Sequence, residues 1–468
     1  MNQLPEQHTG RTEAEEREES AISYGLSDDT VQLIRESLNS GNHVLVRQEL
    51  AELHAADVAD LIEQLKPALR VQLMEVANDL VDAEVYSDLD ETVRDDLVEE
   101  MDPAEIAELV TDLELDDAVH VLEDLEHKEQ QEVLKELSAE DRVVIEEGLS
   151  YQEDTAGRLM QRDLIAVPEY WDIGQTIDFL RETEDLPNEF YEIFVVDPRH
   201  KPIGTIPLDK AMRSRRAVPV TDIMIKEQTL IPVTMDQEEV AYLFQQYRLT
   251  SAAVVNERGG LIGMITIDDI VDVINEEAEE DILRLGGVAE DNLFGSILET
   301  TKTRFTWLLV NLATAILASI AIGFFDQAME KVIALAVLMP IVASMGGNAG
   351  TQTLTVAVRA LATRELTSNN VGRIVSKEAL VATLNGSVFA LLIGGVAWAW
   401  FGDFNIGWVI SVAMVINMFA AGVAGMVVPI TLDKYGVDPA VASSVFVTTI
   451  TDVIGFVAFL GIASLALL

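Results

Sequence analysis

Apolar and polar positions are arranged in three different ways along the 468 residues. Up to about Leu149, apolar residues recur at helical spacing, and the pattern of residues 54–65 (HAADVADLIEQL) returns in residues 102–113 (DPAEIAELVTDL), where Pro103 suits a first helical turn. Short amphipathic helices that cannot bury a face alone predict a helical-repeat domain over residues 26–150. An ordinary helical bundle fits the same pattern.

A second repeat, clearer than the first, covers residues 157–274. A methionine, a proline and an aspartate each recur 64 residues later: Met160 and Met224, Pro168 and Pro232, Asp172 and Asp236. Both copies continue with a strand, a glycine turn, another strand and a helix, and we place about five extra residues of the first copy at residues 184–189. This order resembles a tandem pair of α/β CBS modules, at residues 151–217 and 218–275. Two unrelated small α/β domains would not be expected to share these positions.

Beyond residue 304 the chain is apolar enough for a membrane. Five stretches are long enough to cross roughly 30 Å of hydrocarbon as helices: residues 305–325, 332–357, 379–401, 408–430 and 440–468. Basic residues crowd the second connection, for example Arg359 and Arg373, and Lys434 lies in the fourth. The positive-inside rule therefore predicts a multi-pass protein of the cell membrane, with its amino terminus cytoplasmic and its carboxyl terminus outside.

The distribution of charge also separates residues 1–303 from the apolar residues 304–468. The chain has 80 acidic and 31 basic residues, for a net charge of −49, but residues 304–468 hold only 8 acidic and 7 basic ones. This excess argues against nucleic-acid binding and favours cations as partners. Residues 1–25 are predicted to be a disordered acidic tail, and residues 276–303 an acidic connecting helix. Because the chain has no cysteine and its six histidines show no metal-ligand spacing, hard cations are favoured over softer metals.

Polar and glycine residues interrupt the second expected span. Residues 340–353 (PIVASMGGNAGTQT) contain Pro340, three glycines and two amides, which predicts a loosened helix with freed carbonyls that face protein or water. Such carbonyls are cation ligands. The candidate pore residues are Gly346, Gly347, Asn348, Ala349, Gly350 and Gln352. Simple helix packing through the Gly346–Gly350 pair is the alternative interpretation.

Asp452 is the one acidic residue well inside an expected span, and the fifth span has no basic residue to pair with it. A carboxylate at this depth is expected to face an aqueous path or a cation, and Thr448, one turn earlier, shares its face. Because Mg²⁺ keeps several waters, we infer that two copies of Asp452 on a dimer axis attract one hydrated dication. A protonated Asp452 that donates one hydrogen bond between helices is the structural alternative.

A run of acidic residues ends the second module and enters the connecting helix. It comprises Asp268, Asp269, Asp272, Glu276, Glu277, Glu280 and Asp281. Like charges in rows repel one another unless cations bridge them to another acidic surface, so these rows predict a feedback gate that dications close. A solvated surface adapted to high salt is the alternative interpretation.

Four segments together resemble the MgtE magnesium channels: residues 151–160 (YQEDTAGRLM), 235–240 (MDQEEV), the GGNAGTQ of residues 346–352, and 449–453 (TITDV). The resemblance implies a homodimeric, Mg²⁺-selective channel that cytosolic Mg²⁺ closes, with Asp452 as the pore ligand. It also implies regulatory ions at Asp236, Asp268, Asp272, Glu277, Glu280 and Asp281. ATP binding, known in part of the family, is not assigned to any residue. Ser444 departs from the pattern, since some members have Asn there.

The sequence is also compatible with two other functions. One is a sensor without transport, in which the membrane part is only an anchor, and the other is a channel for Co²⁺ or Mn²⁺. An enzyme is not expected, because the spans contain no His, no Cys and no acid pair.

Overall fold

The structure is a computed structural model that describes residues 25–99, 101–183, 186–187, 190–288, 297–367 and 369–467. It forms two compact units, Met1–Val271 and Asp272–Leu468. Apart from Gly25, the expected acidic tail lies outside the described residues, as do residues 184, 185, 188 and 189 of the expected extra loop.

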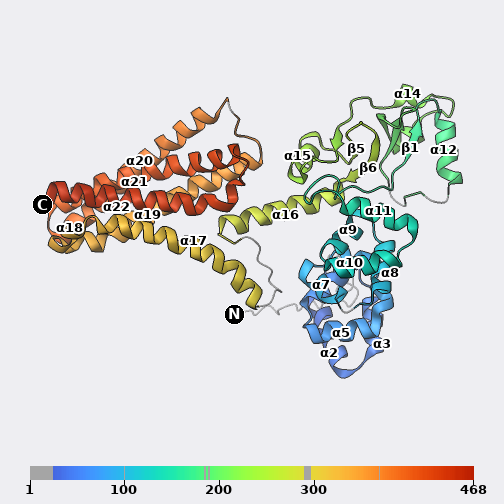
Figure 1. Cartoon of the computed structure of the whole chain (residues 1–468), viewed down its shortest axis with the longest axis horizontal. Coiled ribbons are helices and arrows are strands. Elements are labelled where there is room, and N and C mark those ends of the chain that lie inside the picture. The colour runs from blue at the N-terminus through green and yellow to red at the C-terminus, as the bar shows by residue number, and fades with distance from the viewer. Residues whose placement is uncertain are drawn as a thin grey trace, which may run out of the picture. The chain divides into compact units, whose positions relative to one another are not determined.

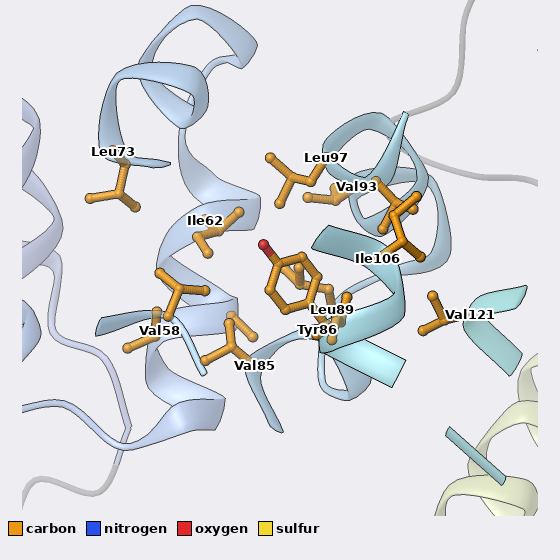
Figure 2. Packing of buried hydrophobic residues seen from close by; sticks show 14 of the residues in the cluster. Val58, Ile62, Leu73, Val85, Tyr86, Leu89, Val93, Leu97, Ile106 and Val121 are labelled. Atoms are coloured by element: carbon orange, nitrogen blue, oxygen red, sulfur yellow. The ribbon is translucent and has the colours of Figure 1, made fainter. Parts of the chain in front are cut away.

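The first part of unit one is a series of short helices (Figure 1). They are α2 (Asp28–Ser40), α3 (His43–Leu50), α4 (Ala55–Gln64), α5 (Pro67–Ala77), the 3-10 helix η1 (Asn78–Leu80), α6 (Ala83–Ser87), α7 (Glu91–Val98), α8 (Pro103–Asp112), α9 (Leu115–Glu123), α10 (His127–Glu136) and α11 (Ala139–Leu149). Their apolar faces share one core, in which the ring of Tyr86 lies near Ile62, Leu89 and Ile106 (Figure 2). The helical spacing of the sequence is thus explained by burial of one face of each helix.

The two CBS modules have the same topology. Their elements are β1 (Ala166–Pro168), α12 (Ile173–Glu182), β2 (Glu192–Val196), β3 (Pro202–Pro207) and α13 (Leu208–Arg213), then α14 (Val220–Ile223), β4 (Leu230–Pro232), α15 (Gln237–Tyr247), β5 (Ser251–Val255) and β6 (Leu261–Thr266). In each sheet the first strand is parallel to the second, and the third is antiparallel to it. The repeated aspartates Asp172 and Asp236 begin helices α12 and α15 by accepting backbone N–H groups.

The segment before the first strand of each CBS module, here called its leading segment, pairs with the other module. Gln161 pairs with Met264 on β6 of the second module, and Ile225 pairs with Thr205 on β3 of the first. Each leading segment lies close to the strand of the other module because Gly263 and Gly204 lack side chains. A Cβ at Gly263 would lie 2.8 Å from the carbonyl oxygen of Gln161. The repeated methionines therefore mark interlocked modules, and part of residues 151–165 packs on the second module.

Helix α16 (Ile267–Leu285) connects the units, and its bounds differ from the expected helix at residues 276–303. It continues directly from β6 and ends before Gly286 and Gly287, where Gly287 adopts a left-handed φ of 78° that ends the helix. Residues 289–296 lie outside the described residues. The expectation of a helix that continues to residue 303 is therefore wrong, because two glycines end it.

Among the described residues of the second unit, five helices are long and apolar enough to cross a membrane: Thr300–Gly323, Ile333–Ala362, Val371–Phe401, Phe404–Lys434 and Ser443–Leu467. They belong to α17 (Ile297–Gly323), α19 (Ile333–Ala362), α20 (Val371–Phe401), α21 (Phe404–Lys434) and α22 (Pro439–Leu467), and the short α18 (Asp326–Lys331) follows the first. In Figure 1, α19, α20, α21 and α22 run alongside one another. The predicted multidomain fold, with five spans, is confirmed.

Candidate functional site

The expectation of a loosened helix at residues 340–353 is wrong, because helix α19 is continuous there. The helix runs without a break from Ile333 to Ala362 and includes Pro340, so the segment is not unwound as its composition suggested. Two of its glycines are buried and allow close packing instead: a Cβ at Gly350 would lie 2.6 Å from Cγ1 of Val447 on α22, and a Cβ at Gly346 would overlap the side chain of Asn417 on α21. Tight contact with neighbouring helices keeps this glycine-rich segment helical. For Gly346 and Gly350 the packing interpretation is therefore the better one.

The opposite side of α19 carries a row of exposed polar side chains. This polar stripe consists of Ser344, Asn348, Thr351, Gln352 and Thr355, spaced so that all five share one helix face. Nδ2 of Asn348 lies 3.4 Å from Oγ of Ser344. Gly347 beside the stripe has open space around it, whereas Ala349 is half-buried. The structure thus brings Asn348 and Gln352 together and places the two packing glycines on the other face.

Asp452 lies near the middle of α22 and is half-buried. Thr448, one turn earlier, is exposed, and Ser444 lies a further turn back. Within the described part of the chain, no basic side chain pairs with Asp452 and no group donates a hydrogen bond to it. A carboxylate with no protein partner at membrane depth is suited to a hydrated cation.

A carboxylate cluster, formed by Glu114, Asp116, Asp117 and Asp269, lies in unit one. Asp269 comes from the first turn of α16, and the other three come from the start of α9. The carboxylate of Asp269 accepts the hydroxyl of Thr266 at 2.7 Å and the amide of Gln161 at 3.3 Å. Burial, with repulsion from Asp268, raises the pKa of Asp269 to about 6.

The cluster is short of countercharge. Burial, followed by repulsion from Asp269 and Asp117, raises the pKa of Asp116, and its buried Oδ1 has no hydrogen-bond partner among the described residues. Loss of hydrating water, then repulsion from Asp269, raises the pKa of Glu114 to about 7. Repulsion among these buried carboxylates would be relieved by a divalent cation, which would replace the protons that they otherwise hold.

The acidic run of the sequence includes Asp269, but no sequence pattern pointed to Glu114, Asp116 and Asp117. The signal in the sequence is three acids at the start of an amphipathic helix, a pattern that usually marks a solvated helix end. Only the tertiary fold brings them to Asp269.

The other predicted regulatory acids are in different surroundings. Asp236 accepts the N–H of Glu238 at 3.0 Å as the cap of α15, which gives it a structural role. Asp268, Asp272 and Glu276 lie on α16 and are exposed, whereas Glu277 on the same helix is half-buried.

Farther along α16, in unit two, Arg284 pairs with Glu280 and with Asp438. Burial, with repulsion from Asp438, raises the pKa of Asp281. Leu285 packs against the apolar cluster that includes Val358, Ala440 and Val447. This end of α16 is therefore joined to the start of α22 by charge and by packing.

One further group in unit one, Glu91, Asp95 and Asp124, has carboxylate oxygens within 4.8 Å of one another. Arg94 already pairs with Asp124 at 2.6 Å. A neighbouring guanidinium opposes a second cation, so we assign no ion site to this group.

These features define a class: a multi-pass membrane protein with a helical domain, a CBS pair and an unpaired carboxylate within a span. The profile of the MgtE family, described as a divalent cation transporter, matches residues 339–462. The MgtE intracellular N domain matches residues 53–154, and a CBS domain matches residues 220–276. The chain belongs to the MgtE family, as the sequence motifs predicted. This is a family of transporters, not enzymes.

Three relatives have the name magnesium transporter MgtE. That of Thermus thermophilus is 35% identical over 320 residues, which cover 68% of this chain and 71% of the relative. Those of Enterococcus faecalis and Bacillus subtilis are 31% and 29% identical, and each match covers 67% of this chain and 70% of the relative.

Two solved structures are similar to part of the chain. The soluble part of a magnesium transporter is 25% identical, with a TM-score of 0.47, and the match covers 54% of this chain and 99% of that one. The cytosolic domain of the Mg²⁺ channel MgtE in complex with ATP is 30% identical, with a TM-score of 0.48, and the match covers 52% of this chain and 99% of that one.

Proposed function

We propose that the protein carries Mg²⁺ passively across the cell membrane, along a path that includes Asp452 of α22 and the polar stripe of α19. The observation that carries this proposal is Asp452, a carboxylate near the middle of a membrane span with no basic partner in the described part of the chain. A membrane anchor needs no such group, because each charge at that depth costs roughly 2.5 to 3.5 kcal/mol on insertion scales. The magnesium transporter relatives support Mg²⁺ as the ion.

The working unit in this proposal is a homodimer. The polar stripe lies on the outer side of α19 in a single chain, where lipid would otherwise meet five polar side chains. A second copy related by a two-fold axis covers such a face and supplies the other Asp452. Two carboxylates on the axis attract one dication without removing the waters that Mg²⁺ holds strongly.

The driving force in this proposal is the membrane potential alone. An inside-negative potential favours entry of a dication by about 4.6 kcal/mol per 100 mV, because each charge contributes about 2.3 kcal/mol. The amino-terminal unit then lies in the cytoplasm and the carboxyl terminus outside, as the basic connections predict.

We further propose that cytosolic Mg²⁺ closes the path by binding to the carboxylate cluster and to the acids of α16. Without ions, Asp116 and Asp269 repel each other. An ion between them would fix the first turn of α16, and an ion at Glu277 and Asp281 would fix its other end. Glu280 already pairs with Arg284, so we do not place an ion there. ATP at the CBS modules is supported by the ATP complex of the similar cytosolic domain, and we assign no residue to it.

Flux into reconstituted vesicles tests the proposal. Asp452→Ala is expected to abolish Mg²⁺ entry while the protein keeps the size of a dimer in detergent, and unchanged entry would remove Asp452 from the path. Competition by Co²⁺ and Mn²⁺ in the same assay tests whether another dication is the true cargo, and absence of any ion flux would favour the sensor.

A further inference from the structure

Asn417 is a buried amide that neither the polar stripe nor the acidic residues include. It lies near the middle of α21 and is fully buried, with Met414 and Met418 as its neighbours one turn away or less. Its Nδ2 donates a hydrogen bond of 2.8 Å to the carbonyl oxygen of Val342 on α19. Since a buried amide is costly unless its polar atoms are paired, this bond ties the two helices together.

Two glycines make room for this amide. A Cβ at Gly455 on α22 would lie 2.7 Å from Nδ2 and 3.1 Å from Oδ1 of Asn417, and a Cβ at Gly346 on α19 would overlap the same group. The amide therefore fills the space of two missing side chains, one on each neighbouring helix, and sets how closely these helices approach α21.

Each of the two glycines lies on a helix that carries a group assigned to the ion path. Gly455 follows Asp452 by three residues on α22, and Gly346 precedes Asn348 by two residues on α19. The separation that Asn417 imposes is thus also the separation between the carboxylate and the helix that carries the polar stripe.

Stability alone does not explain Asn417. Its Oδ1 is buried and has no hydrogen-bond partner among the described residues, an arrangement that typically destabilises a fold. An apolar side chain of similar volume would avoid this penalty.

We propose that Asn417 is a positioning residue for the ion path: its amide holds α19 and α22 at the separation that places Asp452 correctly for the passing dication. This inference rests on the proposed function of Asp452. Residues that orient the direct ligands of a metal typically change its affinity by roughly 10-fold to 100-fold when they are replaced.

The test measures Mg²⁺ entry into vesicles over a range of external Mg²⁺, with the amount of folded dimer measured in parallel. Asn417→Leu keeps most of the volume and removes both polar atoms. It is expected to raise the half-saturating Mg²⁺ concentration by roughly 10-fold with normal yield of folded protein. A purely structural role would instead lower the yield and leave half-saturation unchanged, and that result would overturn the proposal.

A pair of variants tests the geometry if Asn417→Leu folds poorly. Gly346→Ala and Asn417→Ala each disturb the contact, but together the new methyl group occupies space that the amide has vacated. If the two substitutions acted independently, their fold-changes in the half-saturating Mg²⁺ concentration would multiply. The double variant is expected to show a smaller fold-change than that product. Simple multiplication of the effects would overturn the proposal. Gly395→Ala in α20 is the matched control, because a Cβ there meets nothing within 4 Å.

Asp452→Asn, measured in parallel, separates the two proposals. If it conducts like wild type, the path through Asp452 is wrong, and the role of Asn417 falls with it. If Asp452→Asn is inactive and Asn417→Leu has wild-type half-saturation, only the positioning role is wrong.

Discussion

The guanidinium of Arg284 near the end of α16 pairs with the carboxylate of Asp438, which also accepts the N–H of Ala440 at 2.7 Å at the start of α22. Arg284 pairs at the same time with Glu280 on its own helix. One basic side chain thus partly neutralises the acids where α16 meets the helix that carries Asp452, and this contact needs no metal ion.

Arg284→Gln is expected to weaken this contact and to increase Mg²⁺ entry when internal Mg²⁺ is absent. The groups are partly exposed, and such ion pairs are worth about 1 kcal/mol at most, so the increase should not exceed roughly fivefold. High internal Mg²⁺ should still close the path, because the ion can replace the lost charge. Flux into vesicles measures both conditions. Lys331→Gln, an exposed lysine at the end of α18, is the control, and equal flux in Arg284→Gln and this control would contradict the prediction.

The stability of the protein without divalent ions should fall as the pH rises from about 4 to about 7. Asp269 has a pKa of about 6 and Glu114 a pKa of about 7 in the folded chain, both above their ordinary values. A carboxyl group whose pKa is raised by folding stabilises the fold fully below its unfolded value, and this contribution is lost as the pH passes the folded value. For Asp269 the loss is on the order of 3 kcal/mol, because its pKa rises from 3.8 to about 6. Thermal unfolding of the full chain in detergent, from about pH 4 to about pH 8, measures it.

Magnesium should oppose this loss. Saturating Mg²⁺ is expected to raise the melting temperature more at pH 8 than at pH 5, because protons compete with the ion for the carboxylate cluster. Asp269→Asn should reduce both the pH dependence and the Mg²⁺ effect, while Asp209→Asn on α13 should change neither. An equal effect of Mg²⁺ at both pH values would argue against an ion in the cluster.

Gly263→Ala should destabilise the interlocked CBS modules by about 1 to 3 kcal/mol, because its Cβ would lie 2.8 Å from the carbonyl oxygen of Gln161 and 2.9 Å from Sδ of Met160. Gly204→Ala should behave in the same way, because Gly204 meets Ile225 and Met224 at similar distances. Gly372→Ala on α20 has free space for its methyl group and is the control. Thermal unfolding of the three variants measures the difference. A melting temperature of Gly263→Ala equal to that of Gly372→Ala would show that the leading segments do not cross so closely.

The sequence predicted the helical domain from the helical spacing of its apolar residues, the CBS pair from a repeat of 64 residues, and the membrane helices from long apolar stretches. It misjudged α19, where Pro340 and three glycines suggested an unwound segment. Whether a glycine loosens a helix or allows close packing depends on its neighbours, and the neighbours Asn417 and Val447 come from distant parts of the chain.

The candidate sites could be predicted only in part from the sequence. Asp452 was evident because a lone carboxylate contrasts with 29 residues of apolar helix. Asp116 was missed because an acid at a helix start is ordinary until the fold places Asp269 beside it. Asn417 was visible as an amide within an apolar stretch, but its importance depends on Gly346 and Gly455, which no local pattern connects to it.

The most direct measurement is Mg²⁺ entry into vesicles of wild type and Asp452→Asn across a series of inside-negative potentials, with Asp403→Asn at the start of α21 as control. Entry through wild type and the control is expected to increase as the potential becomes more negative, whereas Asp452→Asn, folded and dimeric, is expected to pass almost no Mg²⁺. Entry through Asp452→Asn that matches wild type at every potential would contradict this expectation.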